Sequence, residues 1–222
     1  QSKKYYPAQW VGVPSAYIGF VGRLTYDYKS RYMAEINFGY NGSERLAAGH
    51  RFEFFPAVSA GWVASSEKFW EPISKYINHF KIRGSYGLVG SDAFASGAPH
   101  FLYQNNIGIG SAHNFWTGLP TSEISKKGPG FYVLAVQDAG WEHVKKFDIG
   151  FDMMLFNQLN ITFDYFHDKR ERILMSRASW PSMLGYWGSK PWSNIGEVEN
   201  QGFELSLNWT KQFGKVLTLD LR

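Results

Sequence analysis

Residues 18–40 read IGFVGRLTYDYKSRYMAEINFGY, and the two alternating patterns in this stretch decide the fold. Apolar or aromatic side chains recur at every second position as far as Tyr28, and the positions between them are mostly small or polar. The pattern breaks at residues 29–31 and restarts at Tyr32. A period of two places successive side chains on opposite faces of a β-strand. The stretch therefore predicts two strands with one apolar and one polar face, joined by a short turn.

The rest of the chain repeats this pattern. The further alternating segments cover residues 54–64, 79–88, 146–155, 159–166 and 202–209, and a last one begins at Leu217. Compact connections at 29–31, 66–72, 157–158 and 211–214 take turns with longer ones at 42–51, 90–140 and 169–199. The segment around residues 66–72 has room for one short helix. The chain is thus predicted to be all-β and antiparallel, with about eight strands.

Three features favour a membrane barrel over a soluble β-sandwich. The alternating segments run about ten residues, which suits a membrane-spanning strand better than a globular one. Short turns at one end of the strands and long loops at the other are typical of outer-membrane barrels. Tyrosines and tryptophans stand near the ends of the apolar faces, where an aromatic girdle meets water; they are Tyr26, Tyr28, Tyr32, Tyr40, Tyr86, Tyr165 and Trp209. We therefore expect a transmembrane antiparallel up-and-down β-barrel segment.

The composition excludes several other classes. The 222 residues are 44% hydrophobic and 18% aromatic with a net charge of +4, which is not the profile of a disordered chain. No apolar run is long enough for a membrane helix, and the absence of cysteine excludes disulfides, thiol catalysis and cysteine zinc sites. Lysines and arginines are scattered, so no nucleic-acid partner is expected. The two densest basic places, residues 126–127 and 169–172, are interpreted as solvated loop charge.

The search for chemistry gives no catalytic motif, so the protein is predicted not to be an enzyme, and no cofactor or metal is expected. The six histidines never pair at i, i+4 spacing. Asp148, Asp152 and Asp164 resemble a glycosidase carboxylate set but fall on the polar faces of neighbouring strands, which suits a hydrated barrel lumen. The polar residues expected to face the lumen are Arg23, Asp27, Glu35, Lys81, Arg83, Asp148, Asp152, Asp164 and Glu204.

The long connections carry large aromatic rings. Such rings give much contact area with few rotatable bonds, so they suit a ligand or a partner protein, although packing of the loops on one another explains them equally well. The candidate contact residues are Phe115, Trp116, Trp180, Tyr186, Trp187 and Trp192.

An ordered series of motifs resembles the barrel of the SusC/RagA-type TonB-dependent outer-membrane transporters of Bacteroidetes. The motifs are GRLTYDYK at 22–29, FFPAVSAGW at 54–62, FKIRGSYG at 80–87, FDIGFD at 147–152 and NIGEVENQGFELS at 194–206. Two features depart from the pattern: Asn41 stands where the family usually has Asp, and the stretches 90–140 and 169–188 match no family motif.

The resemblance implies a piece of the C-terminal half of a 22-stranded barrel in the bacterial outer membrane. Residues 1–222 would be part of the barrel domain, with the plug domain and the TonB box outside this sequence. It further implies a SusD-like surface lipoprotein as lid, energy coupling to TonB–ExbB–ExbD through the plug region, contact with outer-membrane lipid, and oligosaccharides or oligopeptides as cargo.

Two alternatives remain open from the residues alone. Eight strands can close into a complete small outer-membrane barrel with a structural or adhesin-like role. The loop tryptophans also suit a soluble carbohydrate-binding β-sandwich.

Overall fold

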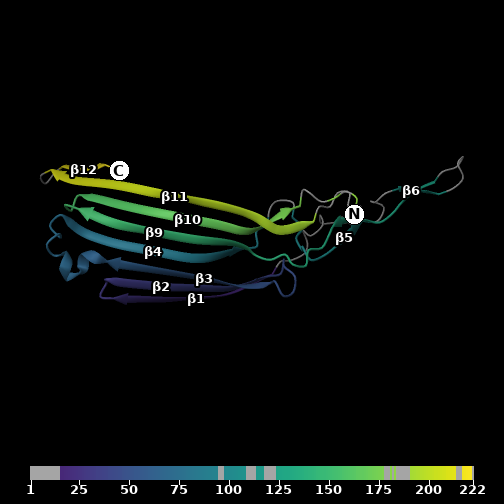
Figure 1. The fold of residues 1–222 in the computed structure, drawn as a ribbon, viewed down its shortest axis with the longest axis horizontal. Coiled ribbons are helices and arrows are strands. Elements are labelled where there is room, and N and C mark those ends of the chain that lie inside the picture. The colour runs from purple at the N-terminus through teal and green to yellow at the C-terminus, as the bar shows by residue number, and fades with distance from the viewer. Residues whose placement is uncertain are drawn as a thin grey trace, which may run out of the picture.

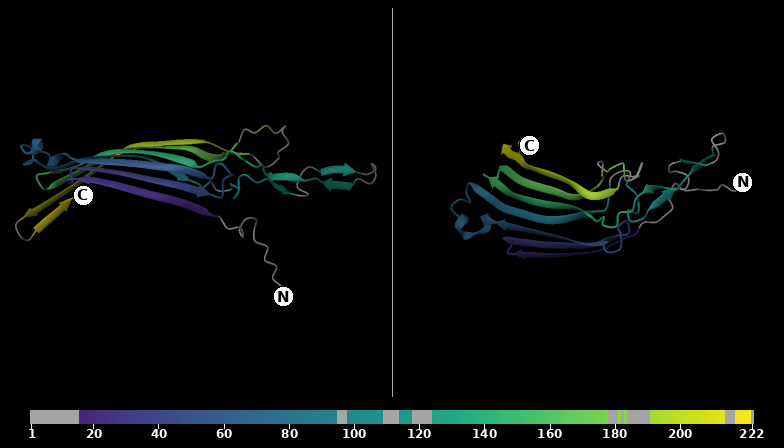
Figure 2. Two further views of the ribbon diagram at one scale, coloured as in Figure 1. Left: turned by 90° about the horizontal axis from the view of Figure 1, so that it is seen from below. Right: turned by 45° about the vertical axis from the view of Figure 1, so that its right-hand side comes forward.

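The computed structural model describes residues 16–94, 98–108, 114–117, 124–177, 181, 183, 191–213 and 217–221. Eight strands in this part form one antiparallel sheet in the order β1-β2-β3-β4-β9-β10-β11-β12 (Figure 1). Their bounds are Tyr17–Tyr28, Tyr32–Ser43, Phe52–Val63, Ile77–Ser91, Glu142–Leu155, Leu159–Ser176, Trp192–Phe213 and Leu217–Leu221. The expected all-β, up-and-down order is confirmed. The further views show the sheet as a curved surface (Figure 2).

The described helices are two short 3₁₀ turns between β3 and β4, namely η1 (Ala64–Ser66) and η2 (Lys68–Trp70). They occupy the connection for which one short helix was predicted. Among the residues that the structure describes, no helix has the length and apolar character needed to cross a membrane.

The strand register keeps the two faces separate across the sheet. On β1 and β2, Phe20 stands opposite Tyr40 and Leu24 opposite Ile36, so apolar side chains align on one face. The same alignment continues to Phe163 opposite Leu205 on β10 and β11. Most of these apolar side chains are exposed instead of packed against a second layer, and Phe163 is half-buried. A slip of one residue would exchange the faces, so the alternation in the sequence fixes the register.

Several strands extend beyond the alternating segments at the end of the sheet that carries the long connections. β10 continues to Ser176 and β11 starts at Trp192, so the predicted loop over residues 169–199 was wrong. The charges at 169–172 lie in β10 and not in a loop. The reason is that hydrogen-bonded pairing continues where neither face is apolar, and the sequence period disappears there.

The connection between β4 and β9 is also more ordered than predicted. It holds two small sheets, in which β5 (Asn106–Gly108) pairs with β8 (Gly130–Val133) and β6 (Asn114–Thr117) pairs with β7 (Ile124–Lys127). Lys126 and Lys127 therefore lie in a strand, β7, and not in a loop as predicted. In Figure 1 this connection projects past the end of the main sheet.

A small hydrophobic core lies where this connection returns to the sheet. Trp141 is 1% exposed and is the largest of its fully buried side chains. The rim core, as we call it, consists of Leu46, Phe55, Leu102, Val136, Ala139, Trp141 and Leu174. These residues come from the β2–β3 and β4–β9 connections and from the sheet, so the core joins two loops at one end of the strands.

Candidate functional site

The polar face of the sheet carries all nine polar residues that the sequence predicted to share one surface. One row of directly opposed residues crosses seven strands and consists of Asp27, Met33, Gly61, Arg83, Gly150, Asp164 and Glu204. Arg23, Glu35, Lys81, Asp148 and Asp152 stand two or four positions from members of this row on the same strands, and therefore lie on the same face.

Arg83 is the centre of a charge cluster on this face. Its Nη2 donates to Asp164 Oδ2 at 2.7 Å, and its Nε donates to Asp152 Oδ2 at 3.3 Å. Asp148 Oδ1 lies 3.8 Å from Nη1. One guanidinium thus neutralises carboxylates on two neighbouring strands, which suits the five-donor fork of arginine better than the single ammonium of lysine.

Two open cavities flank this cluster. One of about 560 Å³ lies towards β1–β3 and is lined by small residues such as Ser59, Gly61 and Ser85 between the charged side chains. The other, of about 440 Å³, lies towards β11; Phe166, Asp168 and Glu204 are among its lining residues. The short side chains leave room above the strands, so this face offers an open polar surface with charged side chains.

Replacing Arg83 with methionine is expected to destabilise the assembled sheet by about 1–2 kcal/mol, because clustered carboxylates lose their counter-charge. The effect stays below that of a fully buried pair because the Arg83 side chain is 35% exposed. The temperature at which the heat-modifiable band of the full-length protein unfolds measures the change.

Arg23→Met is the matched control, since Arg23 pairs with the single carboxylate of Glu35 on a more exposed part of the face. It should lower the unfolding temperature little. Equal shifts for both variants would contradict a special role for the Arg83 cluster.

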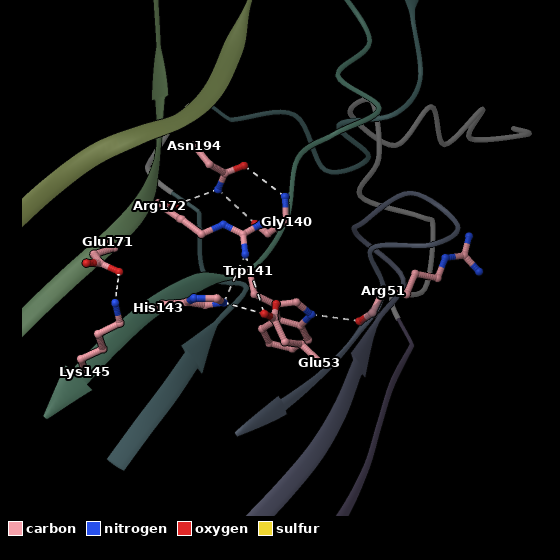
Figure 3. Close-up of polar contacts among 9 residues, drawn as sticks. All are labelled: Arg51, Glu53, Gly140, Trp141, His143, Lys145, Glu171, Arg172 and Asn194. Carbon is pink, nitrogen blue, oxygen red and sulfur yellow. Dashed lines mark hydrogen bonds and ion pairs between the residues drawn. The ribbon is translucent and has the colours of Figure 1, made fainter. Parts of the chain in front are cut away.

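A second polar network holds the rim core in place (Figure 3). Trp141 Nε1 donates to the Arg51 carbonyl oxygen at 2.9 Å. The Asn194 amide bridges two segments: its Nδ2 donates to the Gly140 carbonyl at 3.0 Å, and its Oδ1 accepts from the Gly140 N–H at 3.1 Å. Glu53 Oε1 lies 2.8 Å from His143 Nε2. Asn194 Nδ2 also donates to the Arg172 carbonyl at 2.6 Å, so these contacts tie β3, β9, β10 and β11 together at the loop end.

Glu171 lies on β10 beyond Tyr165, the last aromatic residue on the apolar face of that strand, and is therefore outside the apolar region. Lys145 Nζ approaches one oxygen of Glu171 at 2.6 Å, and Lys169 Nζ approaches the other at 2.8 Å. Hydrogen bonds from these two ammonium groups lower the pKa of Glu171 to about 2.

This lowered pKa predicts a pH dependence at the loop end of β9 and β10. Because the folded pKa lies below the unfolded one, the stabilisation is complete above about pH 4.5 and is lost as the pH falls towards 2. Hydrogen exchange of peptides from 142–176, corrected for intrinsic rates, should speed up between pH 5 and 2.5. Glu171→Gln should remove that pH-dependent part; an unchanged pH profile in this variant would contradict the pairing.

The predicted aromatic contact residues have different environments. Trp116, on β6, is 63% exposed. Phe115 also belongs to β6. Trp192 is the first residue of β11 and packs against the rim core, so it is not in a loop as predicted. Trp180, Tyr186 and Trp187 lie outside the described residues. A role of these rings in ligand contact stays a prediction.

Sequence reasoning missed the rim network, including Trp141, His143 and Arg172. These residues belong to segments without periodic hydrophobicity, and their partners are distant in sequence. Asn194 was the only residue of this network that the sequence could have pointed to, because it begins one of the motifs that resemble the family.

Residues 14–221 match the family model described as "TonB dependent receptor-like, beta-barrel". TonB-dependent receptor P3 of Formosa agariphila is 29% identical over 202 residues, which cover 88% of this chain and 19% of the relative. TonB-dependent receptor SusC of Bacteroides thetaiotaomicron is 24% identical over 92% of this chain and 19% of its own. The chain thus spans about a fifth of the length of these relatives. Their names describe receptors, not enzymes.

Solved structures show the same fold. The RagAB peptide importer in its 'closed-closed' state matches 90% of this chain and 20% of its own with a TM-score of 0.69 at 20% identity. The siderophore receptor PirA of Pseudomonas aeruginosa matches 93% of this chain and 33% of its own with a TM-score of 0.53 at 11% identity. A soluble carbohydrate-binding sandwich is therefore wrong. The chain belongs to the TonB-dependent receptor β-barrel family of the outer membrane, and within it resembles the SusC/RagA type.

Proposed function

We propose that this chain forms wall and extracellular rim of an energy-coupled outer-membrane nutrient importer. The observation that carries the proposal is the two-faced sheet: large apolar side chains are exposed on one face, and charged residues around Arg83 line the other. In a bilayer the apolar face meets lipid and the polar face meets the aqueous lumen. The nine residues on the polar face are then lumen-facing.

The partners follow from the relatives. SusC and RagAB support a SusD-like surface lipoprotein as lid, and the family name supports energy coupling through TonB–ExbB–ExbD, which would act on a plug region outside this sequence. The long connections beyond the rim core lie at the end of the strands where such a lid would sit. The polar face then contacts cargo on its way through the barrel.

The cargo is proposed to be an oligosaccharide or an oligopeptide. The peptide importer RagAB supports the second class by its name. The polar face supports either, because its charged side chains bind peptide termini and also hydrogen-bond to sugar hydroxyls.

Uptake by the native host tests the proposal. A strain that lacks the full-length gene should lose growth on either an oligopeptide mixture or an oligosaccharide mixture as limiting nutrient, and complementation should restore it. Deletion of the TonB gene should abolish the same uptake. Undiminished uptake of both mixtures in the deletion strain would contradict an importer role, and the mixture that fails identifies the cargo class.

A further inference from the structure

A small cavity lies at the loop end of the apolar face, over the ends of β1, β2 and β3. Its volume is about 200 Å³, and its lining is mainly apolar. Ile18, Gly42 and Phe52 are opposed in the register and form its apolar side. The Phe52 ring lies against Gly42, where any Cβ would approach the ring within 2.3 Å. Gly42 is thus required for the shape of this site.

The cavity is at the height where the apolar face ends. Tyr40 stacks on Phe52 with ring centroids 5.5 Å apart. Such amphipathic rings mark the boundary between hydrocarbon and headgroups. Arg51, directly before Phe52, also lines the cavity and therefore lies at the level of the headgroups.

Arg51 has guanidinium N–H groups that can donate hydrogen bonds at the level of the headgroups. Its Nε donates to the Leu46 carbonyl at 3.1 Å, and its carbonyl oxygen accepts from Trp141. These two bonds fix the residue to the rim core. Its guanidinium points away from Trp141 in Figure 3 and lies 5.9 Å from the Tyr103 ring centroid. In the described part of the chain Arg51 forms no ion pair.

Glu44 is the acidic residue that lines the same cavity. Its Oε2 accepts a hydrogen bond from the Ala16 N–H at 2.9 Å, so its carboxylate is held at the end of β1. The negative charge of Glu44 opposes anion binding, but Glu44 leaves the two terminal nitrogens of Arg51 free to donate to a ligand. A guanidinium with two parallel donors matches the oxygens of a phosphate group.

We propose that this cavity binds a phosphorylated glycolipid of the outer leaflet, with an acyl chain against Ile18 and Phe52 and a headgroup phosphate on Arg51. The site is continuous with the apolar face that contacts the membrane, so lipid reaches it by lateral diffusion. Through Arg51, the lipid also fixes the rim core next to Trp141. The inference uses the membrane placement of the sheet and is independent of the cargo.

Native mass spectrometry of the full-length receptor in mild detergent tests the site, with lipid A and dephosphorylated lipid A as probes. Arg51→Gln should bind lipid A about tenfold more weakly and leave the binding of dephosphorylated lipid A unchanged. Arg177→Gln is the matched control, because Arg177 is an exposed arginine at the same end of the sheet. It should bind both lipids as the wild type does.

Ile18→Trp fills the cavity with a larger side chain and leaves Arg51 in place. It should weaken the binding of both lipids at least severalfold. Glu44→Gln should strengthen lipid A binding, since it removes the opposing charge but keeps an acceptor for Ala16. Three results would overturn the proposal. The first is an unchanged lipid A affinity in Arg51→Gln, and the second is an equal loss of affinity for both lipids in that variant. The third is displacement of lipid A by millimolar inorganic phosphate. Heat-modifiable migration confirms that each variant is folded.

Discussion

Replacing Trp141 with alanine in the full-length receptor is expected to open the loop end of the sheet while the strands remain assembled. Trp141 is almost completely buried, packs edge-on against Phe55 at 5.4 Å between ring centroids, and holds the Arg51 carbonyl. Loss of a buried tryptophan destabilises its surroundings by about 3–5 kcal/mol. This loss of stability is confined to the loop end, because the hydrogen bonds between β9 and β10 do not involve the Trp141 ring.

Limited proteolysis of intact cells measures this opening. Cleavage between residues 92 and 141 should become faster by at least tenfold in Trp141→Ala, while heat-modifiable migration stays as in the wild type. Trp116→Ala removes the same side chain from an exposed position and should cleave at the wild-type rate. Equal cleavage rates in Trp141→Ala and wild type would show that the rim core does not hold the loops.

Replacing Leu205 with arginine is expected to reduce assembly in the outer membrane severalfold. Leu205 is 59% exposed on the apolar face, opposite Phe163 and between the aromatic residues near the two ends of that face. A charged side chain near the bilayer midplane of a barrel costs about 2–4 kcal/mol. The amount of heat-modifiable receptor in the outer-membrane fraction should therefore fall severalfold in Leu205→Arg.

The neighbouring residue provides the control. Ser206 is next in sequence but lies on the polar face, opposite Thr162. Ser206→Arg adds the same side chain to the same strand and should assemble at close to the wild-type level. If both variants assembled equally well, or if Ser206→Arg were the more damaging, the assignment of lipid and lumen faces would be reversed or wrong.

The alternating segments predicted eight strands and their order, because a period of two is a local property of the chain. Leu205 and Ser206 were assigned to their faces by this pattern alone. The strand ends at Ser176 and Trp192 were missed, because beyond the apolar region both faces meet polar surroundings. In residues 167–170, HDKR, the ladder to β11 persists but the alternation does not, and pairing resumes at Ile173 after a register shift.

On the polar face, too, the sequence predicted one part of the arrangement and the structure decided the rest. Its nine charged or polar residues were predicted as a set, yet the convergence of Asp152 and Asp164 on Arg83 depends on the register between three strands. Short hydrogen-bonded pairs such as Glu171 with Lys145 also need that register. Charges that are distant in sequence interact only after pairing brings them within a few ångströms.

By itself the sequence determined the strands, their two faces and the family resemblance, since each depends on residue identity at short or motif-length spacing. Only the tertiary structure decided which side chains meet at the loop end. Trp141 comes from the β4–β9 connection, Leu46 and Arg51 come from the β2–β3 connection, and Leu174 comes from β10; no periodicity relates them. They assemble because the sheet brings the ends of its strands together, so burial and hydrogen bonding there are properties of the whole sheet.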